Sequence, residues 1–226
     1  MPKGERWEMD MPQVSIITRC LNRLEYTAQV LDAVRNNTKC SYEHIIVDND
    51  SSDGTNQWMN WMAKHTTWYQ GTVKYVRMNR NHGDWGGMLA GAALAKGEYI
   101  VQLDNDIIPC EGWLTSMLTV LKETDYKVVM LKRDNVAWKL KPLSPVRKVG
   151  DLEIVRVERA VACYMMSKEN FASLQIPENQ GMKSKYIMAK KLKPIGKILN
   201  RTCIELQADF QRKKYNPKNP QIWQTV

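Results

Sequence analysis

Three features are missing from this sequence, and each absence excludes a class of protein. No apolar run in the 226 residues is long enough to span a bilayer, which argues against an integral membrane protein. Residues 1–11 are polar and lack the apolar core of a secretory signal. The cysteines are scattered, odd in number and without the paired spacing of zinc ligands: Cys20, Cys40, Cys110, Cys163 and Cys203. We therefore expect a cytoplasmic protein, soluble or peripheral to a membrane, in a reducing compartment.

Acidic residues are also in short supply. The chain has 33 Lys and Arg against 24 Asp and Glu, a net charge of +9. Such an excess favours an anionic partner, which includes nucleic acid, a membrane surface or a phosphorylated substrate. It is concentrated in residues 183–201, which contain seven basic residues and no acid. This stretch is either a solvated helix face or a surface that meets an anionic membrane or acceptor.

The first half of the chain alternates predicted strands with predicted helices. Apolar, β-branched segments at residues 14–18, 45–47, 73–78 and 99–104 are typical of buried strands. Amphipathic segments between them are typical of helices that cover a sheet. With 43% hydrophobic residues the chain can bury a proper core. We expect an α/β fold, a single Rossmann-like domain with a mostly parallel central sheet flanked by helices.

The alternation breaks after residue 131. Residues 135–149 are rich in proline and lysine, which predicts a loop or flap. Residues 151–157 and 160–166 read as a half-exposed strand and a buried strand, and a basic helix is expected over residues 183–193. We expect the domain to cover residues 1–206, divided at residue 131, with a polar tail over residues 207–226.

Two carboxylates stand at the end of the most apolar predicted strand. Asp104 and Asp106 follow residues 99–103, so they should lie where ligands bind in open α/β sheets, at the carboxyl ends of the strands. Two carboxylates this close repel each other, and a divalent cation is the simplest compensation. Pairs of this kind also occur in turns and helix caps, so the pair gains meaning only from its surroundings.

The segments of sequence before and around this pair resemble those of a family 2 glycosyltransferase. The matching pieces occur in the family's order over somewhat under half of the chain. They are residues 14–18 with Asn22, residues 47–55, residues 81–83 with Gly86, Gly87 and Gly91, and residues 97–106. The resemblance implies the GT-A fold and a nucleoside-diphosphate-sugar donor of the UDP or dTDP type. It also makes residues 12–131 the donor-binding half and residues 132–206 the acceptor side.

The resemblance also implies roles for individual residues. It makes Asp106 the direct ligand of Mn²⁺ or Mg²⁺ and places Asp104 at the ribose or a metal-bound water. On the nucleotide side it places Thr18, Asn22, Asp48, Asp50, Gly83 and Gly87. Thr18, Asp48 and Asp104 should converge, because their strands end at one sheet edge. Asp48 is alternatively a turn-stabilising residue, and the glycines alternatively serve close packing of a helix on the sheet.

The acceptor side departs from the family pattern. The resemblance implies a single displacement that inverts the anomeric centre, with a carboxylate as general base. The family often supplies this base from a Glu-Asp pair, where this chain has Ser184 and Lys185. Glu178 is the nearest carboxylate upstream, and it is either the base or an ordinary exposed residue. A late histidine that sometimes completes the metal shell is also missing.

The expected function is therefore metal-dependent transfer of a sugar to a glycan, lipid-linked or protein-linked acceptor. Nucleic acid is not expected as a partner, although a non-catalytic module that binds a nucleotide sugar or nucleic acid remains an alternative. A sugar-phosphate nucleotidyltransferase is a second alternative. It would need a glycine-rich loop after the first strand, and residues 19–23 contain no glycine.

Overall fold

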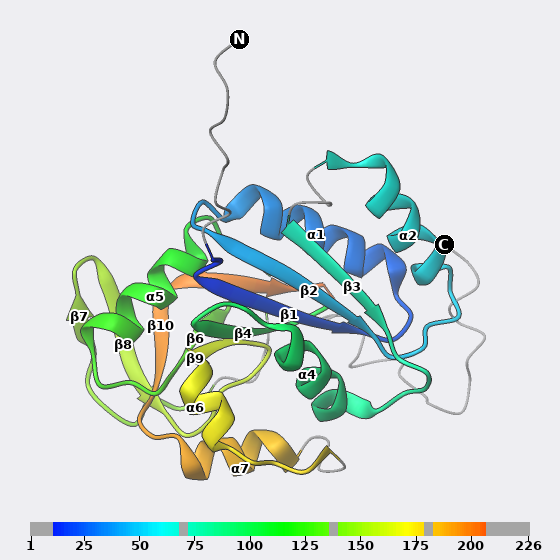
Figure 1. The fold of residues 1–226 in the computed structure, drawn as a ribbon. Helices are drawn as coiled ribbons and strands as arrows, with labels where there is room; N and C mark the ends of the chain where they lie inside the picture. Colours follow the sequence, from blue (N-terminus) through cyan, green and yellow to red (C-terminus); the bar gives the residue numbers. More distant parts are fainter. Residues whose placement is uncertain (1–10, 68–71, 136–139, 179–182, 207–226) are drawn as a thin grey trace, which may run out of the picture.

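The computed structural model describes residues 11–67, 72–135, 140–178 and 183–206. Within them the chain forms one sheet in the order β3-β2-β1-β4-β9-β6-β10-β8-β7, with β5 paired to β10. Helices cover both faces of this sheet (Figure 1). Residues 1–10, the predicted tail from residue 207 and residues 136–139 of the predicted flap lie outside the described residues.

The strands are β1 (Val14–Cys20), β2 (Tyr42–Asp48), β3 (Val73–Arg77), β4 (Tyr99–Asp104), β5 (Ile107–Pro109), β6 (Val128–Arg133), β7 (Arg147–Val149), β8 (Leu152–Val157), β9 (Cys163–Ser167) and β10 (Ile195–Glu205). The helices are α1 (Leu24–Asn37), α2 (Thr55–His65), α4 (Gly83–Leu94), α5 (Trp113–Glu123), α6 (Lys168–Ser173) and α7 (Lys183–Lys191). No described helix has both the length and the apolar character needed to cross a bilayer.

The N-terminal half forms the parallel part of the sheet. Strands β3, β2, β1 and β4 pair in parallel, as their apolar, β-branched sequences predict. Alternate side chains of β1 point to opposite faces. Ile16 packs in one core with residues of α1 and α5, and Ile17 packs in another with residues of α4, α6 and α7. The prediction of an α/β fold with helices on both faces is confirmed.

The C-terminal half adds antiparallel strands to this sheet. Strand β9 pairs antiparallel with both β4 and β6, and β8 pairs antiparallel with β10. Strand β10 is parallel to β6, with a register shift between Ile198 and Thr202. The sequence did not predict β10, because basic and polar residues interrupt its apolar pattern. One of them, Lys197, is nevertheless buried and donates a hydrogen bond to the carbonyl of Leu140.

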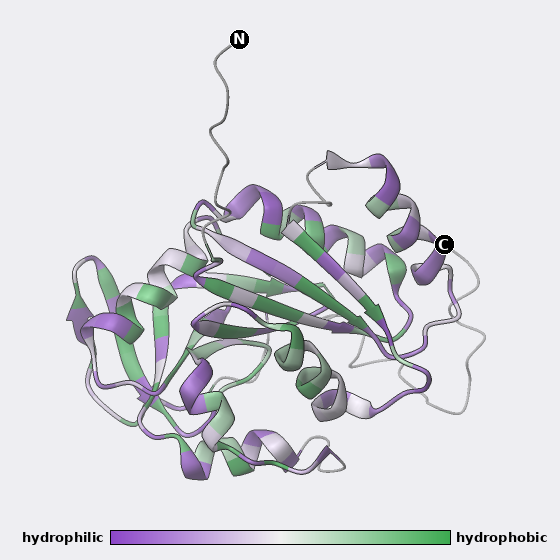
Figure 2. Cartoon of the chain, in the orientation of Figure 1, coloured by the Kyte–Doolittle hydropathy of each residue, from purple (hydrophilic) through white to green (hydrophobic). Residues whose placement is uncertain are grey.

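Helix α4 lies unusually close to the sheet. A side chain at Gly91 would collide with Ile17 of β1 and would come within 3.2 Å of Val47 of β2. Figure 2 shows that α4 is largely hydrophobic, in contrast to the more hydrophilic α2. The small residues of α4 therefore allow close approach, as predicted. This packing fixes the first turn of α4 beside the carboxyl ends of β1 and β2.

Candidate active site

The two predicted carboxylates lie at the carboxyl end of β4 and just after it, beside β1, and arginines contact both. Asp104 is opposite Arg19 in the register of these strands, and the Arg19 Nη2 lies 2.5 Å from Asp104 Oδ1. The same guanidinium donates a hydrogen bond of 2.9 Å to the carbonyl of Asp84 in α4. Arg23 Nη1 lies 3.6 Å from Asp106 Oδ2. Each carboxylate therefore has a cationic partner on one oxygen.

Negative charge is nevertheless concentrated around Asp106. Burial raises the pKa of Asp106 to about 6, and the charges of Asp104 and Glu205 add to the increase, while Arg23 opposes it. Glu205 ends β10, and the backbone N–H of Leu206 donates to the Asp106 carbonyl over 2.8 Å. The end of β10 is thus part of the wall around the acidic pair.

The acidic pair fits a cation that is shared with a substrate. The described residues contain no group of three or more His, Cys, Asp or Glu side chains that could hold a metal. Mg²⁺ commonly binds through one or two carboxylates together with substrate phosphates and water. Asp104 and Asp106 match this donor set, because the arginines contact Oδ1 of Asp104 and Oδ2 of Asp106, one oxygen of each carboxylate.

Two other predicted residues, Asp48 and Thr18, are buried. Asp48 is fully buried and accepts hydrogen bonds from the backbone N–H and hydroxyl of Ser51 and from the hydroxyl of Tyr75. It therefore stabilises the turn after β2, which was the alternative interpretation. Thr18 is also fully buried, and its hydroxyl lies 2.8 Å from His44 Nε2. Both side chains lie on the α1 face of the sheet, so they do not converge with Asp104, which lies on the α4 face.

The loops after β1 and β2 meet through Asn22. The Asn22 backbone N–H donates to the hydroxyl of Ser51, and its Oδ1 accepts a 2.8 Å hydrogen bond from the N–H of Ser52. Asp50 lies in the second loop with φ near 70° and pairs with Arg77, whose Nη2 is 2.6 Å from Asp50 Oδ1. Both side chains of this pair are more than a third exposed. Asp50 and Asn22 therefore lie at the carboxyl edge, where a ligand has access to them.

The two predicted glycines of α4 have different explanations. Gly83 has φ near 70° and open space around the position of a side chain, so the backbone conformation requires it. A Cβ atom at Gly87 would lie 3.1 Å from Arg19 Cγ and 3.2 Å from Asn49 Nδ2. Gly87 therefore lets α4 pack against the arginine that holds Asp104. This geometry agrees with the packing interpretation of that residue.

Glu178 lies close to the first turn of α4. Its Oε1 contacts His82 Nδ1, and the Trp85 indole N–H donates a hydrogen bond of 2.9 Å to the carbonyl of Ile176. Ser184 is buried in the first turn of α7, and the nine residues of that helix include no acid. The structure therefore brings Glu178 to the α4 side of the site, and the usual position of the base carries no carboxylate.

Sequence reasoning missed Arg19 and Arg23. Arg19 is the charged residue in an otherwise buried strand, and its side chain is only 6% exposed. A buried charge usually has a partner, which was a signal that the residue mattered. Its partner Asp104 lies 85 residues away, so the pairing itself was not visible.

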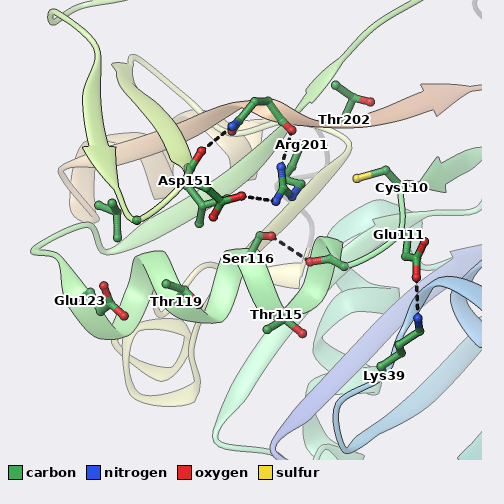
Figure 3. Close-up of a pocket in the computed structure, with 15 residues that line it drawn as sticks. Lys39, Cys110, Glu111, Thr115, Ser116, Thr119, Glu123, Asp151, Arg201 and Thr202 are labelled. Carbon is green, nitrogen blue, oxygen red and sulfur yellow. Dashed lines mark hydrogen bonds and ion pairs between the residues drawn. The ribbon is translucent and has the colours of Figure 1, made fainter.

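A separate hollow lies between α5, the β7–β8 turn and β10 (Figure 3). Its volume is about 800 Å³, and ion pairs between Lys39 and Glu111 and between Arg201 and Asp151 lie along it. None of the predicted site residues lines it. We therefore place the candidate active site at the acidic pair and not in this hollow.

Comparisons with known proteins agree with this geometry. The family model described as "Glycosyl transferase family 2" matches residues 15–187. Glycosyltransferase AglE of Haloferax volcanii is 26% identical over 121 residues, which are 53% of this chain and 38% of that protein. The structure of GalNAc-T7 with UDP, GalNAc and Mn²⁺ has a TM-score of 0.73 at 15% identity, covering 87% of this chain and 44% of that one. The mannosyltransferase PcManGT from Pyrobaculum calidifontis, with GDP-Man and Mn²⁺, has a TM-score of 0.67 at 16% identity, covering 88% and 58%. The chain thus spans less than two thirds of each of these proteins.

Proposed function

The chain belongs to glycosyl transferase family 2 and has the GT-A fold, and from this premise we propose that it transfers a sugar from a nucleoside-diphosphate donor to an acceptor hydroxyl. The observation that carries the proposal is the acidic pair Asp104 and Asp106 at the carboxyl end of β4, with the buried Arg19 of β1 beside it. Ligands of open α/β sheets bind at this edge.

In the proposed mechanism the acidic pair serves the leaving group. Mn²⁺ or Mg²⁺, held by Asp106 with Asp104 beside it, would neutralise the charge that develops on the departing diphosphate. Arg19 fixes the orientation of the Asp104 carboxylate through a contact of 2.5 Å. The Arg23 side chain is 28% exposed and carries a positive charge at the mouth of the site, where it would attract the diphosphate.

The nucleoside is proposed to bind along the loops after β1 and β2. Asn22 joins these loops, and the half-exposed pair of Asp50 and Arg77 offers both an acceptor and donors to a base or ribose. The resemblance favours a UDP or dTDP donor. The solved relatives include one with UDP and one with GDP-Man, so the fold accommodates either a pyrimidine or a purine.

The acceptor is proposed to be a glycan, a lipid-linked or a protein-linked hydroxyl, attacked in one displacement with inversion. Only part of the basic stretch at residues 183–201 would be available to bind an anionic acceptor or a membrane surface. Lys183, Lys190 and Lys193 are exposed on or beside α7, whereas Lys197 is buried in β10. We propose that the protein works in the cytoplasm, with this part of α7 available to such a surface.

The test is donor turnover by the wild-type protein and three variants. A panel of UDP, dTDP and GDP sugars is incubated with Mn²⁺ or with a chelator, and released nucleoside diphosphate is measured. We expect release from one donor that needs the metal. Asp104→Ala and Asp106→Ala should each lower it by at least about 100-fold, with folding checked by circular dichroism. Asp125→Ala, whose side chain is 76% exposed just after α5, is the matched control and should retain turnover.

The same experiment can contradict the proposal. Unchanged turnover in a folded Asp106→Ala variant would remove the acidic pair from the mechanism. If no donor is turned over and none shifts the melting temperature, the protein is a binding module of another kind.

A further inference from the structure

The start of α7 supplies no general base. Its first turn contains Lys183, Ser184 and Lys185, and the buried Ser184 is 3% exposed. Neither a hydroxyl in this environment nor an ammonium group is a good acceptor for the proton of an attacking alcohol. If the chain transfers sugars as proposed, another side chain must take this proton.

Glu178 lies directly over the first turn of α4. A Cβ atom at Gly86 would lie 3.0 Å from Glu178 Cγ and 3.1 Å from Glu178 Oε1, so the absence of a side chain at Gly86 makes room for this carboxylate. The same turn carries Asp84, whose carbonyl accepts the hydrogen bond from Arg19 that also holds Asp104. The first turn of α4 therefore contacts Glu178 directly and contacts Asp104 through Arg19.

The segment that carries Glu178 is fixed to α4. The Trp85 indole N–H donates to the Ile176 carbonyl over 2.9 Å, and its ring stacks on Phe171 of α6 at a centroid distance of 5.4 Å. Ile176 and Phe171 are both buried. Glu178 follows two residues after this anchor, so its backbone position is determined by core packing, while its side chain remains 53% exposed.

His82 determines which oxygen of Glu178 faces outward. Its ring is held between two side chains, because Nε2 lies 3.0 Å from Asn79 Oδ1 and Nδ1 contacts Glu178 Oε1. The imidazole therefore fixes Oε1 of Glu178 against the first turn of α4. Among the described residues no contact holds Oε2, which leaves that atom to meet a substrate.

We propose that Glu178 is the general base of the transfer and that His82 is its positioning residue, an inference that rests on the proposed function. The acceptor oxygen forms its bond to the anomeric carbon and gives its proton to Glu178 Oε2. The bond from that carbon to the diphosphate oxygen breaks, and its electron pair leaves with the nucleoside diphosphate. The hydroxyl becomes strongly acidic as its oxygen bonds to the carbon, so a carboxylate that also binds an imidazole is basic enough to take the proton.

The experiment separates the base from donor binding. Binding of UDP and of the donor that the wild-type protein uses is measured by calorimetry, and release of nucleoside diphosphate is followed with water and with methanol as acceptors. Glu178→Gln keeps the size of the side chain and should lower kcat by about 10²- to 10⁴-fold, with little change in donor affinity. Formate should restore part of the rate of Glu178→Ala by acting as a small external base. Glu169→Gln, an exposed acid on α6, is the control and should behave as wild type.

His82 is tested by a different pattern. His82→Ala should lower kcat by about tenfold without raising KM, because it removes the partner that orients the carboxylate. His82→Gln should recover much of the rate, since its amide can still donate to Glu178. A residue with only a role in folding would lower the fraction of active protein in both variants, which donor binding stoichiometry would show.

Three results would overturn the assignment. A wild-type kcat in Glu178→Gln means that the general base lies elsewhere. If kcat is lost in Asp84→Asn at the same time, the base is Asp84, whose side chain is 45% exposed on the same turn of α4. Loss of donor affinity equal to the loss of kcat means that Glu178 binds the donor. Failure of the wild-type protein to bind any donor contradicts the proposed function, and the base role with it.

Discussion

Lowering the pH from about 7.5 to about 5 should destabilise the folded protein by about 2 kcal/mol through one side chain, His44. His44 lies in β2 with no exposed surface, and burial lowers its pKa to about 3. Its Nε2 meets the Thr18 hydroxyl, and its Nδ1 has no hydrogen-bond partner in the described part of the chain. A proton on this ring would therefore be a buried charge without compensation.

The magnitude follows from linkage between protonation and folding. The unfolded chain binds a proton to this histidine below a pH of about 6.5, whereas the folded protein does so only near 3. Between these values the unfolded state holds more protons, so stability falls as the pH falls, by up to about 1.4 kcal/mol per unit. At a pH near 5, protonation of His44 in the unfolded chain raises the equilibrium constant for unfolding about 30-fold, which lowers the free energy of unfolding by about 2 kcal/mol.

The assay is urea unfolding of wild type and His44→Gln at both pH values. With a slope of about 3 kcal/mol per molar urea, the wild-type midpoint should fall by about 0.7 M more than that of the variant. Other groups that titrate, including Glu43, cancel in this difference. If His44→Gln is too unstable to study, the double variant Thr18→Val with His44→Leu removes both buried polar groups. An equal pH dependence in wild type and variant would refute the role of His44.

Two further predictions concern packing and thiol chemistry. Gly91→Ala should destabilise the protein by about 1–3 kcal/mol, because the added methyl group meets Ile17 and Val47. Urea unfolding measures this change, with Ala93→Ser on the exposed side of α4 as the control. Unchanged stability of Gly91→Ala would mean that α4 can move away from the sheet. N-Ethylmaleimide should modify at most Cys40 and Cys110 in the folded protein, because Cys20, Cys163 and Cys203 are buried and burial raises their thiol pKa values. Counting labels by mass spectrometry before and after unfolding checks this, and rapid labelling of Cys163 in folded protein would contradict it.

The elements that depend on local pattern were predictable from the sequence. The strands that became β1, β2, β3 and β4 are short, apolar and β-branched, so their period and composition identify them. The position of Asp104 at the edge of the sheet followed from the same pattern. Strand β10 was not predictable, because its interior carries Lys197 and Asn200 and its burial depends on its three partner strands β5, β6 and β8.

The details of the site depend on contacts between distant residues. Arg19 and Asp104 are 85 residues apart, and His82 and Glu178 are 96 apart, so no local pattern reveals either pair. Asp48 shows that a local motif can also suggest a binding role that the contacts in the structure do not favour. Its motif matches a nucleotide-binding family, yet Tyr75 and Ser51 occupy its carboxylate. Residue types were thus readable from the sequence, while the face of the sheet that each one occupies was not.

The late arrival of β9 has a consequence for how the protein is made. This strand begins at Cys163 and pairs with both β4, which ends at Asp104, and β6, which ends at Arg133. While the ribosome is synthesising the residues between them, β4 and β6 therefore each have an open edge, and such edges invite pairing with other chains. A nascent chain that has not yet reached the end of β9 lacks the strand that joins β4 to β6. Expression at low temperature or with a chaperone should thus matter more for this chain than its modest size suggests.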